Sequence, residues 1–553
     1  MATAAVDSFD YVIVGAGAAG SVLANRLTED GTTTVCVLEA GPPDRNPYIH
    51  IPAGFIKTLF DPACTWQFKT EPTERTGGRP ISTTQGRTLG GSSSVNGMVY
   101  NRGQPDDFNS WAQRGNRGWG YADVLPYFRR TERRIGVADD SVRGRSGGIP
   151  VTDMDWIHPV SEAFIQGCVN AGIPRNPDYN SGSQAGVGYF QRAILKGRRV
   201  SAARGFLKPA MARRNLEVRT NARACGIVFE GRRAVGVRYL ASRGGAPREV
   251  RARREVILSG GTANTARLLQ VSGVGPAALL GRLGVPVVHE LPGVGENFRD
   301  HYAVRLVMRA KPGVTTMNEL SRGPRLGLQI ARWATGRPSI LALAPSQVHV
   351  FWRSDDAPGA PDLQCVFTPG SYKEGAVYVL DEYPGVTAGA WPHRPESKGH
   401  VRARSTDVFE DPVIQPNYLS DPMDRQVTLG GIRLVRRLLN TPELAPYLER
   451  ETLPGPDVRA DDELLDYAYR NGSTCYHLIG TARMGPASDP TAVVDDQLRV
   501  HGMEGLRVVD ASVMPSMPSA NTYATTLMIA EKASDMIRGR PAEEPAVLRA
   551  DAA

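Results

Sequence analysis

The segment DYVIVGAGAAG (residues 10–20), followed by VCVLE (residues 35–39), determines the fold expected for this chain. An apolar run of strand length enters a G-x-G-x-x-G turn, a helical pattern follows, and a second apolar run ends in an acid. This order is typical of a βαβ unit that binds a dinucleotide. A glycine-rich turn without a ligand would explain the glycines, but not the flanking strands or the spaced acid.

Each glycine has a separate task in such a unit. Gly15 permits the tight turn, Gly17 lets the backbone approach a pyrophosphate at the helix N-terminus, and Gly20 lets helix and strand pack closely. Glu39 follows the glycines by about 20 residues, where its carboxylate can accept hydrogen bonds from ribose hydroxyls. A 2′-phosphate would be repelled by Glu39, so NADP is disfavoured.

The composition is that of a soluble globular protein of several structural units. The chain has 553 residues, of which 41% are hydrophobic and 22% charged. Its net charge of +8 comes largely from arginine clusters such as 198–199 and 251–254. Because these clusters lack interleaved aromatic residues and any nucleic-acid motif, they indicate a solvated basic surface and no nucleic-acid partner. Loose attraction to an anionic membrane surface stays open.

Cysteine spacing and the N-terminus indicate the compartment. Six cysteines are scattered without a C-x-x-C pair, so neither a disulfide framework nor a metal site is expected. The N-terminus has no recognisable secretory signal, and the longest apolar stretch is too short to span a bilayer. We therefore expect a cytoplasmic protein, with loose association with the inner membrane surface as an open alternative.

A second glycine-rich motif, GRTLGGSSSVN, occupies residues 86–96. Small residues and backbone donors concentrated at one point are what a loop that wraps a phosphate or contacts a flavin requires. A Ser/Gly linker is the alternative, but the apolar residues Met98 and Val99 follow almost at once.

This loop resembles the first signature of the glucose-methanol-choline (GMC) flavoprotein oxidoreductases. Residues 261–275 (GTANTARLLQVSGVG) resemble the second signature and depart from it at Ala266. A third resemblance covers YHLIGTARMG (residues 476–485) and NTYATT (residues 521–526). The resemblance extends from residue 9 to about residue 540 and implies that the dinucleotide is FAD. Covalently flavinylated relatives carry a histidine at the place of Val95, so we expect FAD to be bound non-covalently.

The resemblance implies an α/β fold in which a Rossmann-like FAD-binding domain is interleaved with an α+β substrate domain containing a mostly antiparallel sheet. Residues 347–352 and 363–367 have the alternation expected of antiparallel strands that roof the flavin. The expected units are FAD-binding parts at 1–152, 194–303 and 469–540, substrate-domain parts at 153–193 and 304–468, and a tail at 541–553.

The resemblance assigns catalysis to His477 and Asn521. Alcohol oxidation by a flavin requires removal of the hydroxyl proton and hydride transfer from the carbinol carbon to flavin N5. A neutral imidazole can take that proton, so His477 is the expected base. Asn521 cannot titrate, and we expect it to hold the substrate oxygen by a hydrogen bond.

The remaining site residues follow from the motifs and the resemblance. The expected cofactor contacts are Gly15, Gly17, Ala18, Ala19, Gly20, Glu39, Ala40, Arg87, Gly90, Gly91, Ser93, Asn96, Gly97, Met98, Val99, Ala224, Gly260, Asp510, Ala511 and Thr522. The expected substrate-pocket residues are the aromatic side chains Phe351, Trp352, Trp391 and Tyr476.

Several functions stay open at this stage. The resemblance is greatest to choline dehydrogenases and bacterial primary-alcohol dehydrogenases, which pass electrons to a quinone or another acceptor. An oxygen-using oxidase of aryl or furan alcohols is an alternative. A flavin-dependent lyase or a photodecarboxylase-type relative belongs to another class. The sequence does not determine which alcohol is the substrate, nor the oligomeric state.

Overall fold

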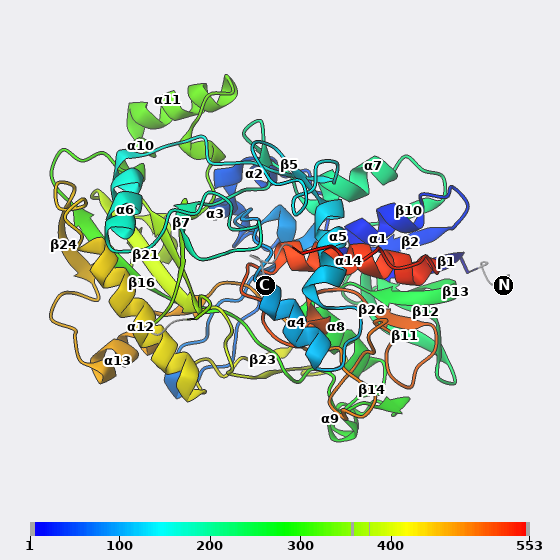
Figure 1. Cartoon of the computed structure of the whole chain (residues 1–553). Helices are drawn as coiled ribbons and strands as arrows, with labels where there is room; N and C mark the ends of the chain where they lie inside the picture. Colours follow the sequence, from blue (N-terminus) through cyan, green and yellow to red (C-terminus); the bar gives the residue numbers. More distant parts are fainter. Residues whose placement is uncertain (1–5, 356–358, 375, 549–553) are drawn as a thin grey trace.

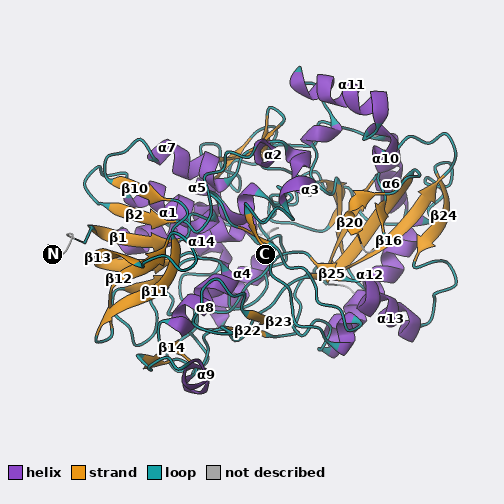
Figure 2. Cartoon of the chain, turned by 180° about the vertical axis from the view of Figure 1, so that it is seen from behind, coloured by secondary structure: helices purple, strands orange, loops and turns teal. Residues whose placement is uncertain are grey.

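Two large β-sheets lie side by side in the computed structural model, which describes residues 6–355, 359–374 and 376–548 (Figures 1 and 2). One sheet lies next to the N-terminus. The other is covered on its outer side by the helix α12 (Pro422–Leu439).

The first sheet contains the strands of the predicted βαβ unit. Its order is β10-β2-β1-β13-β12-β11, and β26 pairs with the end of β13. Strands β10, β2, β1, β13 and β26 run parallel, whereas β12 and β11 form an antiparallel extension. The bounds are β1 (Ser8–Val14), β2 (Val35–Leu38), β10 (Leu216–Arg219), β11 (Arg223–Glu230), β12 (Arg233–Leu240), β13 (Arg248–Leu258) and β26 (Leu506–Val508).

Helices bury the central strands, which explains why those strands are apolar. Val12 and Ile13 are fully buried, as expected for a parallel strand covered on both faces. The helix α1 (Ala18–Leu27) packs against α14 (Tyr523–Arg538), and α14 packs against α5 (Tyr121–Thr131). Figure 1 shows α14 running along the side of this sheet.

The second sheet is antiparallel. Its order is β24-β16-β21-β18-β17-β7, and β25 pairs with the start of β16. One face carries apolar side chains that pack beneath α12, and the opposite face lines a cavity described below. The bounds are β7 (Gly186–Tyr189), β16 (Tyr302–Ala310), β17 (Val348–Trp352), β18 (Leu363–Thr368), β21 (Gly385–Pro392), β24 (Leu448–Leu453) and β25 (Ser473–Thr474).

The chain alternates between the two sheets. Strand β7 joins the second sheet, and β10 to β13 return to the first. Strands β16, β17, β18, β21, β24 and β25 build the second, and β26 with α14 ends in the first. The predicted fold class, a Rossmann-like unit interleaved with an antiparallel sheet, is confirmed. Further helices are α4 (Pro105–Gln113), α6 (Pro159–Asn170), α8 (Thr262–Val271), α9 (Ala277–Leu283), α11 (Gly323–Ala334) and α13 (Asp461–Asn471).

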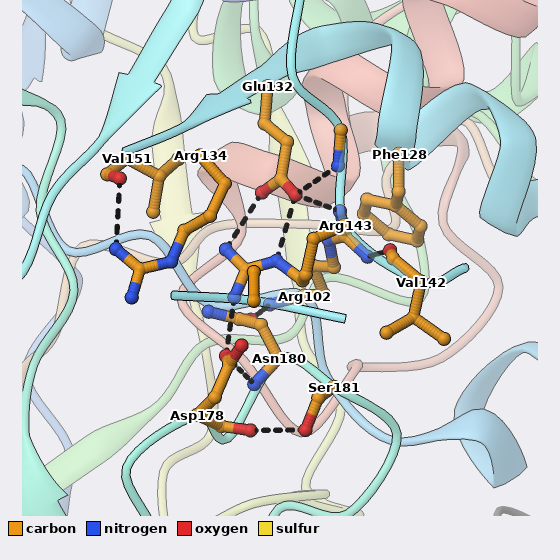
Figure 3. A network of polar contacts seen from close by, with 12 residues as sticks. Arg102, Phe128, Glu132, Arg134, Val142, Arg143, Val151, Asp178, Asn180 and Ser181 are labelled. Atoms are coloured by element: carbon orange, nitrogen blue, oxygen red, sulfur yellow. Dashed lines mark hydrogen bonds and ion pairs between the residues drawn. The ribbon is translucent and has the colours of Figure 1, made fainter. Parts of the chain in front are cut away.

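A buried ion network holds together the segments that follow the glycine- and serine-rich loop of residues 86–96, the Gly-Ser loop (Figure 3). Arg102 Nη2 lies 2.6 Å from Glu132 Oε1, and Arg143 Nε lies 2.8 Å from the same oxygen. Arg143 also pairs with Asp178. Because Arg102, Glu132 and Arg143 are almost fully buried, loss of one partner would leave an uncompensated charge at a cost of about 3–5 kcal/mol. The network therefore fixes the relative positions of the chain segments around Arg102, Glu132 and Arg143.

Gly20 provides a test of the close packing between helix and strand. A Cβ atom at Gly20 would lie 1.9 Å from the carbonyl oxygen of Gly15, whereas a Cβ at Gly281 in α9 would meet nothing within 4 Å. We predict that Gly20→Ala lowers the FAD content and the thermal midpoint of the purified protein, because relieving the clash costs about 1–3 kcal/mol. Gly281→Ala is the control and should retain both. Equal FAD content and midpoint in the two variants would contradict the packing argument.

Candidate active site

A cavity of about 390 Å³ takes its walls from both sheets. This volume lies within the range of small-molecule and cofactor sites. At one end the lining comes from the βαβ unit and the Gly-Ser loop, and at the other end it comes from the second sheet and the C-terminal motifs. The cavity therefore brings together segments from across the whole sequence.

The nucleotide end has the features that a pyrophosphate and a ribose need. Gly15 has a φ of +103°, and a Cβ there would meet Ser259 O at 2.4 Å, so the turn requires glycine. Gly17 precedes α1 without a side-chain cap, which leaves N–H groups at the helix N-terminus for an anion. Glu39 Oε2 accepts from Ala16 N at 2.9 Å, and burial raises the pKa of Glu39 to about 7. Ala18, Ala19 and Ala40 also line this end.

The Gly-Ser loop packs directly on the first glycine turn. A Cβ at Gly91 would lie 2.7 Å from Gly17 Cα, so the two glycine-rich segments touch. Ser93 Oγ accepts from Ala202 N at 2.9 Å, and Asn96 Oδ1 accepts from Met98 N at 3.0 Å. The predicted residues of this loop that line the cavity are Gly91, Ser93, Asn96, Gly97, Met98 and Val99.

Asp510 contacts both the cavity and the neighbouring backbone. Its Oδ2 accepts from Gly261 N at 2.9 Å and Thr265 Oγ1 at 2.6 Å, and its Oδ1 accepts from Ser512 N at 2.8 Å. The carboxylate thus caps the short helical turn that follows it and holds the start of α8. Ala224, Gly260 and Ala511 lie in the same wall.

The helix α14 points its N-terminus at the cavity. Thr522 precedes it without a side-chain cap, and Thr522 and Tyr523 both line the cavity. The unpaired N–H groups and the macrodipole of this helix favour negative charge at that place.

His477 and Asn521, expected from the sequence to act together, meet in this cavity. Asn521 Nδ2 lies 3.0 Å from His477 Nε2, and Gln364 Nε2 donates to Asn521 Oδ1 at 3.2 Å. On its other side, His477 Nδ1 lies 2.8 Å from Nδ1 of His301. Four side chains thus form one hydrogen-bonded series.

A backbone carbonyl fixes the direction of every bond in this series. His301 Nε2 lies 2.7 Å from the carbonyl oxygen of His393, which can only accept, so His301 carries its proton on Nε2. Burial lowers the pKa of His301 to about 4, so its Nδ1 is an unprotonated acceptor. His477 Nδ1 must therefore donate to it, and His477 Nε2 keeps a lone pair facing Asn521 and the cavity. The arrangement selects the tautomer that a base at Nε2 requires.

Burial and the neighbouring His301 hold the pKa of His477 well below its ordinary value. Its imidazole is therefore neutral at neutral pH and able to accept a proton. The backbone around it is also constrained. Tyr476 has a φ of +65°, and His477 N donates to the buried Asp300 Oδ1 at 2.8 Å.

Five predicted contacts lie outside the cavity lining. Gly20 serves helix packing, Gly90 has a φ of +88° within the loop, and Arg87 Nη2 donates to Pro62 O at 2.6 Å. Phe351 is fully buried beside Tyr179 and His349, and Trp352 packs with the core on the opposite face of the sheet. Of the four aromatic residues expected in the substrate pocket, the structure brings Trp391 and Tyr476 to the cavity.

The predicted solvation of the basic clusters is wrong for Arg199. This side chain is buried, and its Nη1 donates to Asn96 Oδ1 at 2.9 Å and to Ser93 O at 3.2 Å. Burial lowers its pKa to about 9. Arg199 therefore holds the Gly-Ser loop in place through its hydrogen bonds to Ser93 and Asn96.

Sequence reasoning missed Asp300, His301 and Gln364. His301 is one of nine histidines and Gln364 lies in an ordinary strand pattern, so no local signal distinguished them. Their function depends on strand pairing that brings residues 301, 364, 477 and 521 together.

A dinucleotide-binding βαβ unit joined to a neutral, oriented histidine defines the class of protein, a nucleotide-dependent oxidoreductase. Comparison with known proteins identifies the family. Profiles described as GMC oxidoreductase match residues 9–303 and 395–530. The chain belongs to the GMC oxidoreductase family, and its dinucleotide is FAD. Val95 lies in the cavity wall, where it offers no group for a covalent bond to the flavin.

Relatives extend over nearly the whole chain. An oxygen-dependent choline dehydrogenase of Staphylococcus aureus (strain MSSA476) is 41% identical and aligns with 97% of this chain and 95% of its own length. An alcohol dehydrogenase [acceptor] of Pseudomonas putida is 39% identical over 96% of this chain and 95% of its own length. The crystal structure of pyridoxine 4-oxidase from "Mesorbium loti" superposes with a TM-score of 0.86 at 31% identity, covering 96% and 100% of the two chains.

His301 can be tested by a pair of isosteric amides. The amide oxygen of His301→Asn falls near the place of Nδ1 and can still accept from His477, whereas His301→Gln places its amide near Nε2 and leaves His477 Nδ1 without an acceptor. We predict that flavin reduction slows by about 10- to 100-fold in the Gln variant and stays within about fivefold in the Asn variant. Stopped-flow measurement of flavin reduction checks this. Equal rates in both variants would contradict the assignment of the tautomer.

Proposed function

We propose that this protein oxidises a primary alcohol to an aldehyde and acts as a dehydrogenase. The observation that supports this best is the lone pair of His477 Nε2, which faces the cavity beside the amide of Asn521. A hydroxyl placed between these two side chains can give its proton to Nε2 while the Asn521 amide donates to its oxygen.

The side chains have separate tasks in this proposal. His477 takes the hydroxyl proton, and the acceptor at His301 stabilises the charge that then develops on the imidazole. Asn521, held by Gln364, orients the oxygen so that the carbinol hydrogen points into the cavity. FAD, when bound, supplies the two-electron acceptor for that hydrogen as a hydride. Residues of both sheets enclose the site and exclude water.

The choice of electron acceptor follows from the relatives. The P. putida relative is named an alcohol dehydrogenase [acceptor], so we propose a quinone or another acceptor other than O2. The S. aureus relative is named an oxygen-dependent choline dehydrogenase, which makes O2 the second candidate. The structure of pyridoxine 4-oxidase keeps an oxygen-using oxidase as the second candidate. A photodecarboxylase would not need a neutral base held in a single tautomer, so the His301 arrangement favours oxidation over that chemistry. A lyase that cleaves a cyanohydrin also removes a hydroxyl proton, so this alternative is separated by assay, as cyanohydrin cleavage without flavin bleaching.

We predict that primary alcohols bleach the flavin of the purified holoenzyme under anaerobic conditions. His477→Ala should slow this bleaching by about 10²- to 10⁴-fold, because it removes the base. The pKa of His477 lies below its usual range, so the wild-type rate should stay level as pH falls through 6.5 and decline only at more acidic pH. Slow return of colour in air indicates a dehydrogenase, and prompt return indicates an oxidase. Near-normal bleaching in His477→Ala would contradict the proposal.

We further propose peripheral association with an anionic membrane, which would bring the enzyme to a lipid-dissolved quinone. The helix α11 projects from the body at the end of the molecule opposite α9 (Figures 1 and 2). Its apolar residues face solvent, with Leu328 60% and Ile330 48% exposed, while polar Gln329 is buried. This arrangement is the inverse of an ordinary surface helix.

The charge around α11 matches an anionic surface. Residues 320–340, which include α11, contain four arginines and no acidic residue. Arginines that flank an exposed apolar helix face are typical of a helix that lies in a membrane interface, where each contributes about 1 kcal/mol. No described helix has both the length and the apolar character needed to cross a bilayer.

We predict that the protein sediments with vesicles of phosphatidylcholine and phosphatidylserine, and less with phosphatidylcholine alone. The double substitution Leu328→Glu with Ile330→Glu should abolish this sedimentation, because it places two charges on the apolar face. Val287→Glu, at an exposed valine that follows α9, is the control and should retain it. If the wild-type protein stays in the supernatant with the anionic vesicles, the membrane proposal is wrong.

A further inference from the structure

The far end of the cavity contains an arginine without an opposing charge. Arg305 lies on β16, on the sheet face that lines the cavity. Its side chain forms no ion pair or hydrogen bond with any residue that the structure describes. The only carboxylates in the described lining are Glu39 and Asp510, and both belong to the nucleotide end.

The strand register shows where this guanidinium is anchored. Arg305 pairs with Gly389 of β21, and a Cβ at Gly389 would lie 3.0 Å from Arg305 Cγ, so the arginine side chain runs over the glycine. Thr387 and Trp391 project from the same face on either side of Gly389, and both line the cavity. Arg305 is therefore flanked by a hydroxyl and an indole.

These neighbours have unused hydrogen-bonding capacity. Thr387 Oγ1 and Trp391 Nε1 are buried and have no partner among the described residues, although both residues are at least nine-tenths buried. Buried polar groups are normally paired, so unpaired ones in a cavity wall indicate a ligand. A guanidinium, an indole N–H and a hydroxyl together suit the two oxygens of a carboxylate.

Trp391 connects this cluster to the reacting end. Its ring centroid lies 6.5 Å from that of His477 and 6.3 Å from that of His301. His301 in turn contacts the carbonyl oxygen of His393, which lies two residues beyond Trp391 on the side away from Thr387. At about 3.3 Å per residue, the four residues from His301 to Arg305 span roughly 13 Å of backbone. A molecule that reaches both ends therefore has several carbon atoms between its hydroxyl and its anionic group.

We infer that Arg305, Thr387 and Trp391 form a subsite for a carboxylate, and that the substrate is an alcohol carrying a carboxylate several carbons from its hydroxyl. This inference rests on the proposed alcohol oxidation and specifies its substrate class. Arg305 would repel the positive charge of a trimethylammonium group. None of the described residues at this end supplies a carboxylate to pair with such a group, so its binding is disfavoured.

Two matched substrate pairs test the subsite. We expect kcat/KM for 6-hydroxyhexanoate to exceed that for hexan-1-ol by about 10- to 100-fold, the range of a hydrogen bond between charged groups. We expect 3,3-dimethylbutan-1-ol, the neutral isostere of choline, to be preferred over choline. Both differences should appear mainly in KM, because the carboxylate binds away from the reacting carbon.

Arg305→Met should remove the preference for 6-hydroxyhexanoate, whereas Arg305→Lys, which keeps the positive charge, should retain part of it. Arg309→Met is the matched control, because Arg309 lies on the same strand outside the cavity lining, beside Glu449. It should leave the ratio of the two kcat/KM values unchanged. Equal kcat/KM for the acid and hexan-1-ol in the wild-type enzyme, or an unchanged ratio in Arg305→Met, would overturn the inference. Failure of every alcohol to reduce the flavin would instead overturn the proposed function.

Discussion

The hydrogen bond from His301 to the carbonyl oxygen of His393 is the constraint on which the site depends. A carbonyl can only accept, so this single contact fixes the proton of His301, then that of His477, and then the orientation of the Asn521 and Gln364 amides. Low polarity around the pair keeps both rings neutral. The reacting nitrogen is thus prepared by the fold before any substrate arrives.

The two sheets together position the residues of this hydrogen-bonded series. His301 precedes β16, His393 follows β21, and Gln364 lies on β18, so the antiparallel pairing of the second sheet supplies one side of the series. His477 follows β25 of the second sheet by three residues, whereas Asn521 precedes α14, which runs along the first sheet. The pair of His477 and Asn521 therefore exists only where the two sheets meet. The same sheet face carries Arg305, so one structural element both orients the base and sets the charge of the substrate end.

Much of this arrangement could be predicted from local sequence. The βαβ unit has a periodic apolar pattern, and its glycines stand where a side chain would clash. The close approach of Gly20 to Gly15 agrees with the close packing predicted for Gly20. Strands β17 and β18 also fall where alternation predicted them.

Side-chain direction was harder to predict. Phe351 and Trp352 are neighbours on one strand and point to opposite faces, and neither lines the cavity. Strand register alone places His301 beside His477 and Arg305 in the cavity wall. The sequence also indicated a solvated surface charge at Arg199, which is buried in the structure. Long-range pairing, which no short motif encodes, decides these cases.

The most direct test of the central claim is the protonation state of His477, observed by ¹⁵N NMR of the histidine-labelled holoenzyme, with the His477 signals assigned from their loss in His477→Ala. We expect a neutral ring protonated at Nδ1 and unprotonated at Nε2, unchanged as pH falls through 6.5. A ring protonated at Nε2, or one that gains its second proton near pH 6.5 or above, would contradict the account.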